Sequence, residues 1–302
     1  CWRGPGSSGA KASGMLLLID YSSMLYRAYH STPSTVPMNG LHGFLSSLAR
    51  VLQDRKPSGL AVCCDDDWRP QFRVEALPMY KTHRVGDLPD PVTPQEALGR
   101  EFLDALGLAV VGWPGYEAED IVATLAHSHP GEVIEILSGD RDLFDLVEDP
   151  RIRVLYPAKG GIQVVTESWI TEKYGIPGRS YGDFALLRGD PSDGLPGVAG
   201  IGEKTAATLI ARYGSLEAVQ AASDLNPKIR AKLEASAAYL KAAAEVVMPV
   251  RDLPLPQRDL SLPEQPRDPQ TVERITREYS LGNAVQRFQK CVSDLTALKA
   301  RS

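Results

Sequence analysis

Short apolar runs alternate with longer amphipathic stretches along the first half of the chain. Four runs have the length and composition of buried strands: residues 15–19, 59–64, 108–112 and 133–137. Between them, apolar residues recur at helical spacing in three stretches: residues 41–53, 94–106 and 118–127. This alternation predicts an α/β fold in which a central, mostly parallel sheet is flanked by helices on both faces.

The second half of the chain has a different pattern. After about residue 160 it becomes mainly helical, residues 252–269 are rich in proline and predict an extended linker, and a last helical stretch covers 269–298. We therefore predict an α/β core at 15–182 and a helical region at 183–302. Residues 1–14 are rich in Gly and Ser and precede Met15, so we interpret them as an expression remnant or a disordered segment.

Residues 68–93 interrupt the regular alternation of strands and helices. The segment is punctuated by prolines and carries a cluster of basic side chains, including Arg69, Arg73, Lys81 and Arg84. A connection of this length inside a compact domain is usually functional. We therefore expect this segment to take part in the activity.

Composition excludes two broad classes of protein. The chain has 302 residues, of which 43% are hydrophobic and 24% charged, and it contains no apolar run long enough to cross a membrane. Its four cysteines show neither a disulfide framework nor a zinc-ligand spacing. We therefore expect a globular protein of a reducing cytoplasm, without a membrane partner.

Nine carboxylates stand where predicted strands end or predicted helices begin: Asp20, Asp66, Glu117, Glu119, Asp120, Asp140, Asp142, Asp190 and Asp193. The carboxyl ends of parallel strands meet at one edge of a sheet, so we expect these acids to converge. Unpartnered like charges are costly to bury, and oxygen ligands without His or Cys favour Mg²⁺ or Mn²⁺. The net charge is −5, so without these nine acids the chain carries +4, which is compatible with phosphate binding.

Taken singly, each acidic group has a structural alternative. Residues 117–120 match an acidic helix cap, residues 138–142 an Asx turn with a helix N-cap, and residues 187–193 a solvated turn. The joint presence of the three groups with Asp20 and Asp66 favours the metal site over these alternatives.

A glycine-rich loop follows the third acidic group. It contains Gly197, Gly200 and Gly202 and leads into Lys204 and Thr205 at a predicted helix start. Backbone N–H groups at such a helix start bind phosphate, which is typical of a helix-hairpin-helix that holds the DNA backbone without reading bases. The alternative is a plain Gly-rich turn between helices. The spacing does not match a Walker A loop.

With these blocks in place, the chain resembles the bacterial flap endonuclease family. It is similar to the 5′-nuclease domain at the N-terminus of DNA polymerase I and to phage 5′-exonucleases. The matching blocks are residues 18–20, 72–75, 80–84, the three acidic groups and 189–206, and the resemblance covers about residues 15–290. It implies a PIN-like nuclease core, a helical arch at about 68–93 and a helix-hairpin-helix (H3TH) region. No polymerase region follows, so we expect a stand-alone member.

The resemblance also implies a function. It suggests a divalent-metal-dependent 5′-3′ exonuclease and flap endonuclease that uses two metal ions in primer removal and DNA repair. Its substrate would be DNA with a 5′ end or flap at a single-strand/duplex junction, with an RNA–DNA hybrid as a further candidate substrate. A DNA polymerase and a ligase are the expected functional partners, and the bacterial cytoplasm, at the nucleoid, is the expected location.

Individual roles follow from the same resemblance. The first metal group would be Asp20, Asp66, Glu117, Glu119 and Asp120, and the second Asp140, Asp142, Asp190 and Asp193. Lys81 and Arg84 would act on the scissile phosphate. The expected DNA contacts are Arg73, Tyr80, Gly197, Gly200, Gly202, Lys204 and Thr205, and a K⁺ ion would bind the loop carbonyls of Val198 and Ile201.

Two departures from the family pattern stand out. Glu119 occupies a position where bacterial members usually have Asp, and the longer side chain could change metal spacing or affinity. Asp66 is flanked by Asp65 and Asp67, so the sequence leaves open which of these three aspartates binds the metal.

Two other functions compete with the nuclease. A DNA-structure binder that has lost a metal is disfavoured because Asp190 and Asp193 are both present. A toxin-like ribonuclease with a related small acidic site is disfavoured by the chain length and by the glycine-rich loop.

Overall fold

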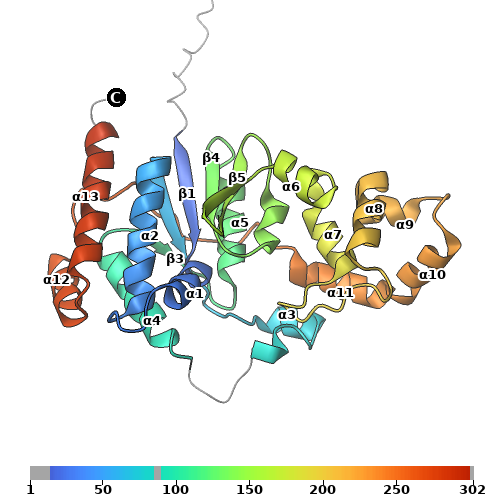
Figure 1. The fold of residues 1–302 in the computed structure, drawn as a ribbon, viewed down its shortest axis with the longest axis horizontal. Coiled ribbons are helices and arrows are strands. Elements are labelled where there is room, and N and C mark those ends of the chain that lie inside the picture. Colours follow the sequence, from blue (N-terminus) through green and yellow to red (C-terminus); the bar gives the residue numbers. More distant parts are fainter. Residues whose placement is uncertain (1–13, 85–89, 300–302) are drawn as a thin grey trace, which may run out of the picture.

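The computed structural model describes residues 14–84 and 90–299. Its centre is one six-stranded sheet with the order β3-β2-β1-β4-β5-β6 (Figure 1). The strands are β1 (Met15–Asp20), β2 (Gly59–Cys63), β3 (Ala109–Val111), β4 (Val133–Leu137), β5 (Ile152–Ala158) and β6 (Gly161–Val165). Strands β1 to β5 pair in parallel and β6 is antiparallel to β5. The predicted mostly parallel sheet is confirmed.

The hairpin of β5 and β6 was not predicted. Its apolar positions are interrupted by Arg153 and Tyr156, so it lacks the apolar run by which the four other strands were predicted. The two-residue turn is made by Lys159 and Gly160, and Gly160 has φ +100°, which glycine adopts without steric cost.

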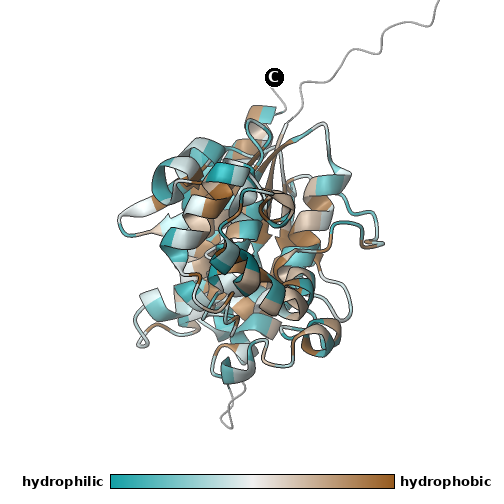
Figure 2. Ribbon diagram, turned by 90° about the vertical axis from the view of Figure 1, so that its right-hand side faces the viewer, coloured by the Kyte–Doolittle hydropathy of each residue, from teal (hydrophilic) through white to brown (hydrophobic). Residues whose placement is uncertain are grey.

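Helices cover both faces of the sheet, because alternate strand residues point to opposite sides. Leu17 and Ile19 of β1 face a core built with α1 (Tyr21–Ser31), α2 (Asn39–Arg55) and α4 (Thr93–Ala105). Leu16 and Leu18 face a second core, which contains α5 (Ala118–Ser128) and α7 (Tyr181–Arg188). Figure 2 shows the apolar residues gathered along the strands and the inward helix faces.

The region after β6 is helical, as predicted. It contains α6 (Glu167–Tyr174), α7, α8 (Glu203–Tyr213), α9 (Leu216–Ala221), α10 (Pro227–Ala235) and α11 (Ala237–Val247). The proline-rich segment then returns the chain to the sheet, where the N–H of Leu60 donates to the carbonyl of Leu260 at 2.7 Å. The last two helices, α12 (Pro269–Glu278) and α13 (Gly282–Lys299), pack against α4 and α2 respectively (Figure 1).

The segment expected to form a helical arch has little helix in its described part. It contains α3 (Gln71–Ala76) and the 3-10 turn η1 (Thr82–Arg84), and residues 85–89 lie outside the described residues. Pro70 and Pro78 have no N–H to donate, and they bracket α3. Residues 1–13 also lie outside the description. Among the helices of the described ranges, none is long and apolar enough to cross a membrane.

Candidate active site

The acids converge at the carboxyl ends of the strands. Asp20 ends β1, where its carboxylate caps α1 through the N–H of Ser23 (3.2 Å) and accepts the hydroxyl of Ser138 (2.6 Å). Glu117 and Glu119 stand at the start of α5, and Asp142 follows β4. The predicted convergence has a topological cause, since β1 and β4 end, and α5 begins, at the same edge of the sheet.

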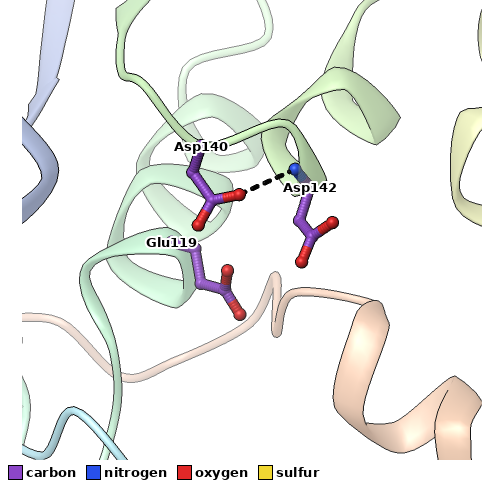
Figure 3. Close-up of side chains that lie close together, drawn as sticks. All are labelled: Glu119, Asp140 and Asp142. Carbon is purple, nitrogen blue, oxygen red and sulfur yellow. Dashed lines mark hydrogen bonds between the residues drawn. The ribbon is translucent and has the colours of Figure 1, made fainter. Parts of the chain in front are cut away.

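Three carboxylates form the centre of the site. Glu119, Asp140 and Asp142 each offer an oxygen, and the three atoms lie within 4.8 Å of one another (Figure 3). The N–H of Asp142 donates to Asp140 at 3.0 Å, which fixes the tight turn between them. A compact set of oxygen donors without His or Cys fits a hard divalent cation such as Mg²⁺ or Mn²⁺.

Burial disfavours the charged form of the carboxylates in this cluster. Burial raises the pKa of Asp20 to about 7, and repulsion from Asp65 and Asp140 adds to that effect. The pKa values of Glu119 and Asp142 are also raised well above their ordinary range, first by burial. For Asp142, repulsion from Asp140 is the next cause. A bound cation would relieve this repulsion, which supports the fit of the donor set to a metal.

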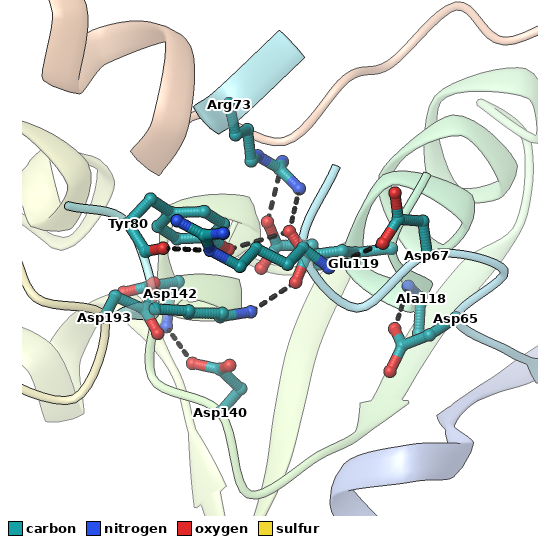
Figure 4. Close-up of polar contacts among 12 residues, drawn as sticks. Asp65, Asp67, Arg73, Tyr80, Ala118, Glu119, Asp140, Asp142 and Asp193 are labelled. Carbon is teal, nitrogen blue, oxygen red and sulfur yellow. Dashed lines mark hydrogen bonds and ion pairs between the residues drawn. The ribbon is translucent and has the colours of Figure 1, made fainter. Parts of the chain in front are cut away.

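Arg73 supplies a positive charge inside the cluster. Its side chain is fully buried, with Nη2 2.7 Å from Glu119 Oε1 and two bonds, of 2.8 and 3.1 Å, to Asp120 (Figure 4). It also forms an ion pair with Glu117. The predicted contact of Arg73 with DNA is thereby corrected, because three carboxylates surround a guanidinium that has no exposed surface.

The predicted contact of Tyr80 with DNA is corrected for a similar reason. Its side chain is 1% exposed and its hydroxyl donates to Glu117 Oε2 at 2.7 Å. The ring therefore has no free face on which an unpaired base could stack.

Asp120 has a structural role that the sequence did not reveal. Its side chain is completely buried and accepts the N–H groups of Val250 (2.8 Å) and Glu117 (3.2 Å) besides the two bonds from Arg73. These four bonds occupy both oxygens, so Asp120 joins α5 to the chain after α11. The predicted metal-ligand role of Asp120 conflicts with this arrangement.

The structure distinguishes the three consecutive aspartates after β2. Asp66 is exposed and accepts the N–H of Gly115 at 3.3 Å. Asp65 accepts the N–H of Ala118 at 2.6 Å, and its charge raises the pKa of Asp20. Asp65, whose bond to Ala118 is drawn in Figure 4, therefore takes the place near Asp20 that was predicted for Asp66.

The third acidic group contributes one buried carboxylate. Asp193 is 5% exposed, and Arg84 Nη2 lies 2.9 Å from its Oδ1. Asp190 accepts the N–H of Ser192 at 2.8 Å and lies 3.3 Å from Arg188. Both acids raise the pKa of Asp142, which places them within electrostatic reach of the central trio.

The two predicted catalytic cations also reach the acids. Lys81 is 6% exposed and its ammonium bonds to Glu117, while the Arg84 side chain is 43% exposed. Both come from the segment before residue 85, so this segment lies over the carboxyl ends of the strands.

The glycine-rich loop has one tightly packed glycine and two exposed ones. Gly197 has φ +72° and its N–H donates to Tyr239 Oη at 3.1 Å, and a Cβ there would lie 2.4 Å from the carbonyl of Arg188. Gly200 and Gly202 are exposed. Gly197 therefore serves packing rather than phosphate contact.

The loop then leads into α8. Lys204 is exposed in its first turn and Thr205 is half-buried behind it. Of the carbonyls expected to hold K⁺, that of Val198 accepts the N–H of Ile201 at 2.9 Å. The carbonyl of Gly200 accepts Lys232 Nζ at 2.7 Å.

Comparison with known families decides what kind of site this is. Residues 15–175 match the model of the 5′-3′ exonuclease N-terminal resolvase-like domain, and residues 176–270 match that of the 5′-3′ exonuclease C-terminal SAM fold.

The chain belongs to the 5′-3′ exonuclease family.

Individual relatives agree with the family assignment. The chain is 44% identical over 296 residues to a 5′-3′ exonuclease of Streptomyces coelicolor, a match that covers 90% of this chain and 98% of the relative. It is 44% identical over 256 residues to a 5′-3′ exonuclease of Mycobacterium tuberculosis, covering 75% and 80% of the two chains. DNA polymerase I of Mycobacterium bovis is 41% identical over 220 residues, covering 69% of this chain and 24% of the polymerase.

Solved structures share the fold. The bacteriophage T5 flap endonuclease, solved with DNA and metal ions, has a TM-score of 0.64 at 18% identity and covers 93% of this chain and 98% of its own. The catalytic core of Rad2 with a DNA substrate has a TM-score of 0.56 at 16% identity, covering 92% of each chain. As a member of the 5′-3′ exonuclease family, the protein is a nuclease that hydrolyses its substrate.

Proposed function

We propose that this 5′-3′ exonuclease hydrolyses phosphodiester bonds in DNA at 5′ ends and 5′ flaps, with two divalent metal ions in the acidic cluster. The trio of buried Glu119, half-buried Asp140 and buried Asp142, beside two basic side chains, carries this proposal. When bound, Mg²⁺ or Mn²⁺ would lower the pKa of an attacking water and stabilise the leaving oxygen.

The metal-holding residues are proposed from their placement. Glu119, Asp140 and Asp142 would form the centre, with Asp20 and Asp65 on the β1 side. Asp190 and Asp193 are the remaining acids, and we assign them to the second metal ion. Glu117 would join the site only after exchanging one of its present partners.

The basic side chains over the cluster would bind the scissile phosphate. Lys81 and Arg84 lie on the segment beside Glu117 and Asp193, where a phosphate held over the acids would contact them. Positive charge at this place would stabilise the charge that develops on the phosphate oxygens.

The duplex part of the substrate would lie along the glycine-rich loop. Gly200, Gly202 and Lys204 are exposed at the N-terminus of α8, where free N–H groups and the ammonium suit a phosphate. Thr205 would contribute its hydroxyl. A K⁺ ion at this loop stays a proposal, supported by the resemblance and opposed by the hydrogen bonds on the carbonyls of Val198 and Gly200.

The wider role is also proposed. Removal of RNA primers, cleavage of RNA–DNA hybrids, DNA repair and cooperation with a polymerase and a ligase at the nucleoid would follow from 5′ flap cleavage. The division of the chain into a core at 15–182 and a helical region at 183–302 remains a prediction.

Cleavage of a labelled DNA flap tests the function directly. Purified protein is incubated with a 5′-labelled flap duplex in Mg²⁺, Mn²⁺ or EDTA. We expect cutting at the junction in either metal and none in EDTA. Asp142→Asn and Asp65→Asn should each lose at least about 100-fold in rate, which corresponds to about 2.7 kcal/mol. Asp66→Asn is the matched control and should retain activity.

Other outcomes would contradict specific parts of the proposal. Tight flap binding without cutting in both metals would indicate a DNA-structure binder. A large loss in Asp66→Asn, with Asp65→Asn unaffected, would restore the original assignment of Asp66.

A further inference from the structure

Glu117 is the point at which the segment of residues 71–84 is tied to the acidic cluster. Its Oε2 accepts the hydroxyl of Tyr80 at 2.7 Å and an ion pair from Arg73, and its Oε1 accepts the ammonium of Lys81. The residue is 4% exposed, so water does not compete for these positions. In this arrangement both oxygens are occupied by donors from one segment.

The two cations on Glu117 are held differently. Arg73 is fully buried and also contacts Glu119 and Asp120, so its positive charge stays among carboxylates if Glu117 lets it go. Among the described residues, the ammonium of Lys81 has one carboxylate ion pair, the one to Glu117, while Asp193 and Glu119 attract it from a longer distance. Lys81 is therefore the cation that can be exchanged.

The backbone at Lys81 is fixed independently of its side chain. Its N–H donates to the carbonyl of Asp193 at 2.9 Å, and the Arg84 guanidinium donates to the carbonyl of Ser192 at 2.6 Å. Gly194 lies so close that a Cβ there would be 2.7 Å from the carbonyl of Met79. The Lys81 side chain can therefore leave Glu117 while the segment stays over the site.

We propose that the Lys81 ammonium and a divalent cation compete for the Glu117 carboxylate, so that cation binding releases Lys81 toward the substrate phosphate. A divalent cation on Oε1 and the ammonium bonded to the same oxygen repel each other, so the binding of one weakens the binding of the other. This inference rests on the proposed function and deepens it. In the metal-free protein Lys81 is paired with Glu117 and is not available to a phosphate. Metal binding would free it, so the affinities for metal and for phosphate are linked.

Lysine reactivity tests the release. The full chain is acylated at its amines in EDTA and in saturating Mn²⁺, and the modified lysines are identified by mass spectrometry. We expect Lys81 to react slowly in EDTA and at least about tenfold faster in Mn²⁺, in proportion to the freed fraction. Lys228, exposed on α10, is the control within the same molecule and should not change. Mn²⁺ binding seen by calorimetry with unchanged Lys81 labelling would overturn the proposal.

Metal affinity supplies a second readout. Lys81→Met removes the competing cation, so Mn²⁺ should bind several-fold more tightly while flap cleavage falls. Lys228→Met makes the same charge change on an exposed surface and should leave Mn²⁺ affinity as it was. Equal or weaker Mn²⁺ binding in Lys81→Met would contradict the competition.

The outcomes separate this inference from the proposed function. If the protein cuts flaps without metal-dependent release of Lys81, the proposed function stands and the competition at Glu117 is refuted. If the protein releases Lys81 in Mn²⁺ but cuts no flap, the competition at Glu117 stands and the proposed function is refuted.

Discussion

Replacement of Arg73 by methionine should strongly destabilise the metal-free protein. The guanidinium is fully buried and paired with Glu117, Glu119 and Asp120, whereas methionine fills a similar volume without charge. Removing one partner of a buried ion pair typically costs about 3–5 kcal/mol, because the other charge stays buried and unpaired. Here three carboxylates lose the same cation, so we expect a loss of at least about 3 kcal/mol at pH 7.5.

Urea denaturation followed by circular dichroism measures this loss. In EDTA the unfolding midpoint of Arg73→Met should fall clearly below that of the parent protein. Saturating Mn²⁺ should reduce the difference, because a cation bound only by the folded state stabilises it and replaces part of the missing charge. Arg212→Met is the control, since Arg212 pairs with Asp224 on the surface with side chains 60% and 58% exposed. Such a pair contributes below about 1 kcal/mol.

A loss below about 1 kcal/mol in EDTA would refute the reasoning, because it would mean that the buried acids need no internal cation. A difference between the two proteins that is the same in EDTA and in Mn²⁺ would also count against it, since Arg73 would then act only through packing.

Three further predictions concern pH, packing and DNA. Burial raises the pKa of Asp20 from 3.8 to about 7, so between these pH values the folded metal-free protein binds more protons than the unfolded one. Its unfolding free energy in EDTA should therefore fall by up to about 4 kcal/mol as pH rises through this window, and Asp20→Asn should flatten that slope in urea titrations. Gly197→Ala should lower the midpoint of thermal unfolding by an amount equivalent to about 1–3 kcal/mol, because its Cβ would meet the Arg188 carbonyl at a positive φ; an unchanged midpoint would contradict this packing role. Lys204→Ala should weaken duplex binding and lower the slope of log affinity against log salt by about 1, and an unaltered slope in fluorescence anisotropy titrations would show that Lys204 contacts no phosphate.

The central sheet could be predicted because its strands are continuous apolar runs. Strands β1, β2 and β4 are buried on both faces and contain almost no polar residues, which left a strong signal. The β5–β6 hairpin lies at the edge of the sheet and mixes polar with apolar residues. The local signal for this hairpin is the Lys159-Gly160-Gly161 stretch between two segments of mixed polar and apolar residues.

The choice between Asp65 and Asp66 could not be made from the sequence for a related reason. Every residue of β2 is buried, so the strand has no alternation of polar and apolar positions from which to judge the direction of the next side chain. The answer depends on the N–H groups of Gly115 and Ala118, which come from a loop and a helix about 50 residues later.

Arg73 shows a more general difficulty. Its predicted DNA contact came from the resemblance to the flap endonuclease family, and a basic residue in a proline-rich segment is also typical of a surface that binds phosphate. The contrary signal was the acidic cluster itself, since so many converging carboxylates need positive charge before any metal arrives. Which cation supplies it depends on how α3 packs on α5, a tertiary contact that local sequence does not encode.

The return of the chain to its starting core has a consequence for how the protein is made. Val272 and Ile275 of α12, with Phe288 and Val292 of α13, complete the same core as Leu17 and Ile19 of β1. During synthesis this core stays incomplete until α12 and α13 have followed, because these two helices cover α4 and α2. A nascent chain that stalls between α11 and α13 would present an uncovered apolar surface to chaperones and proteases.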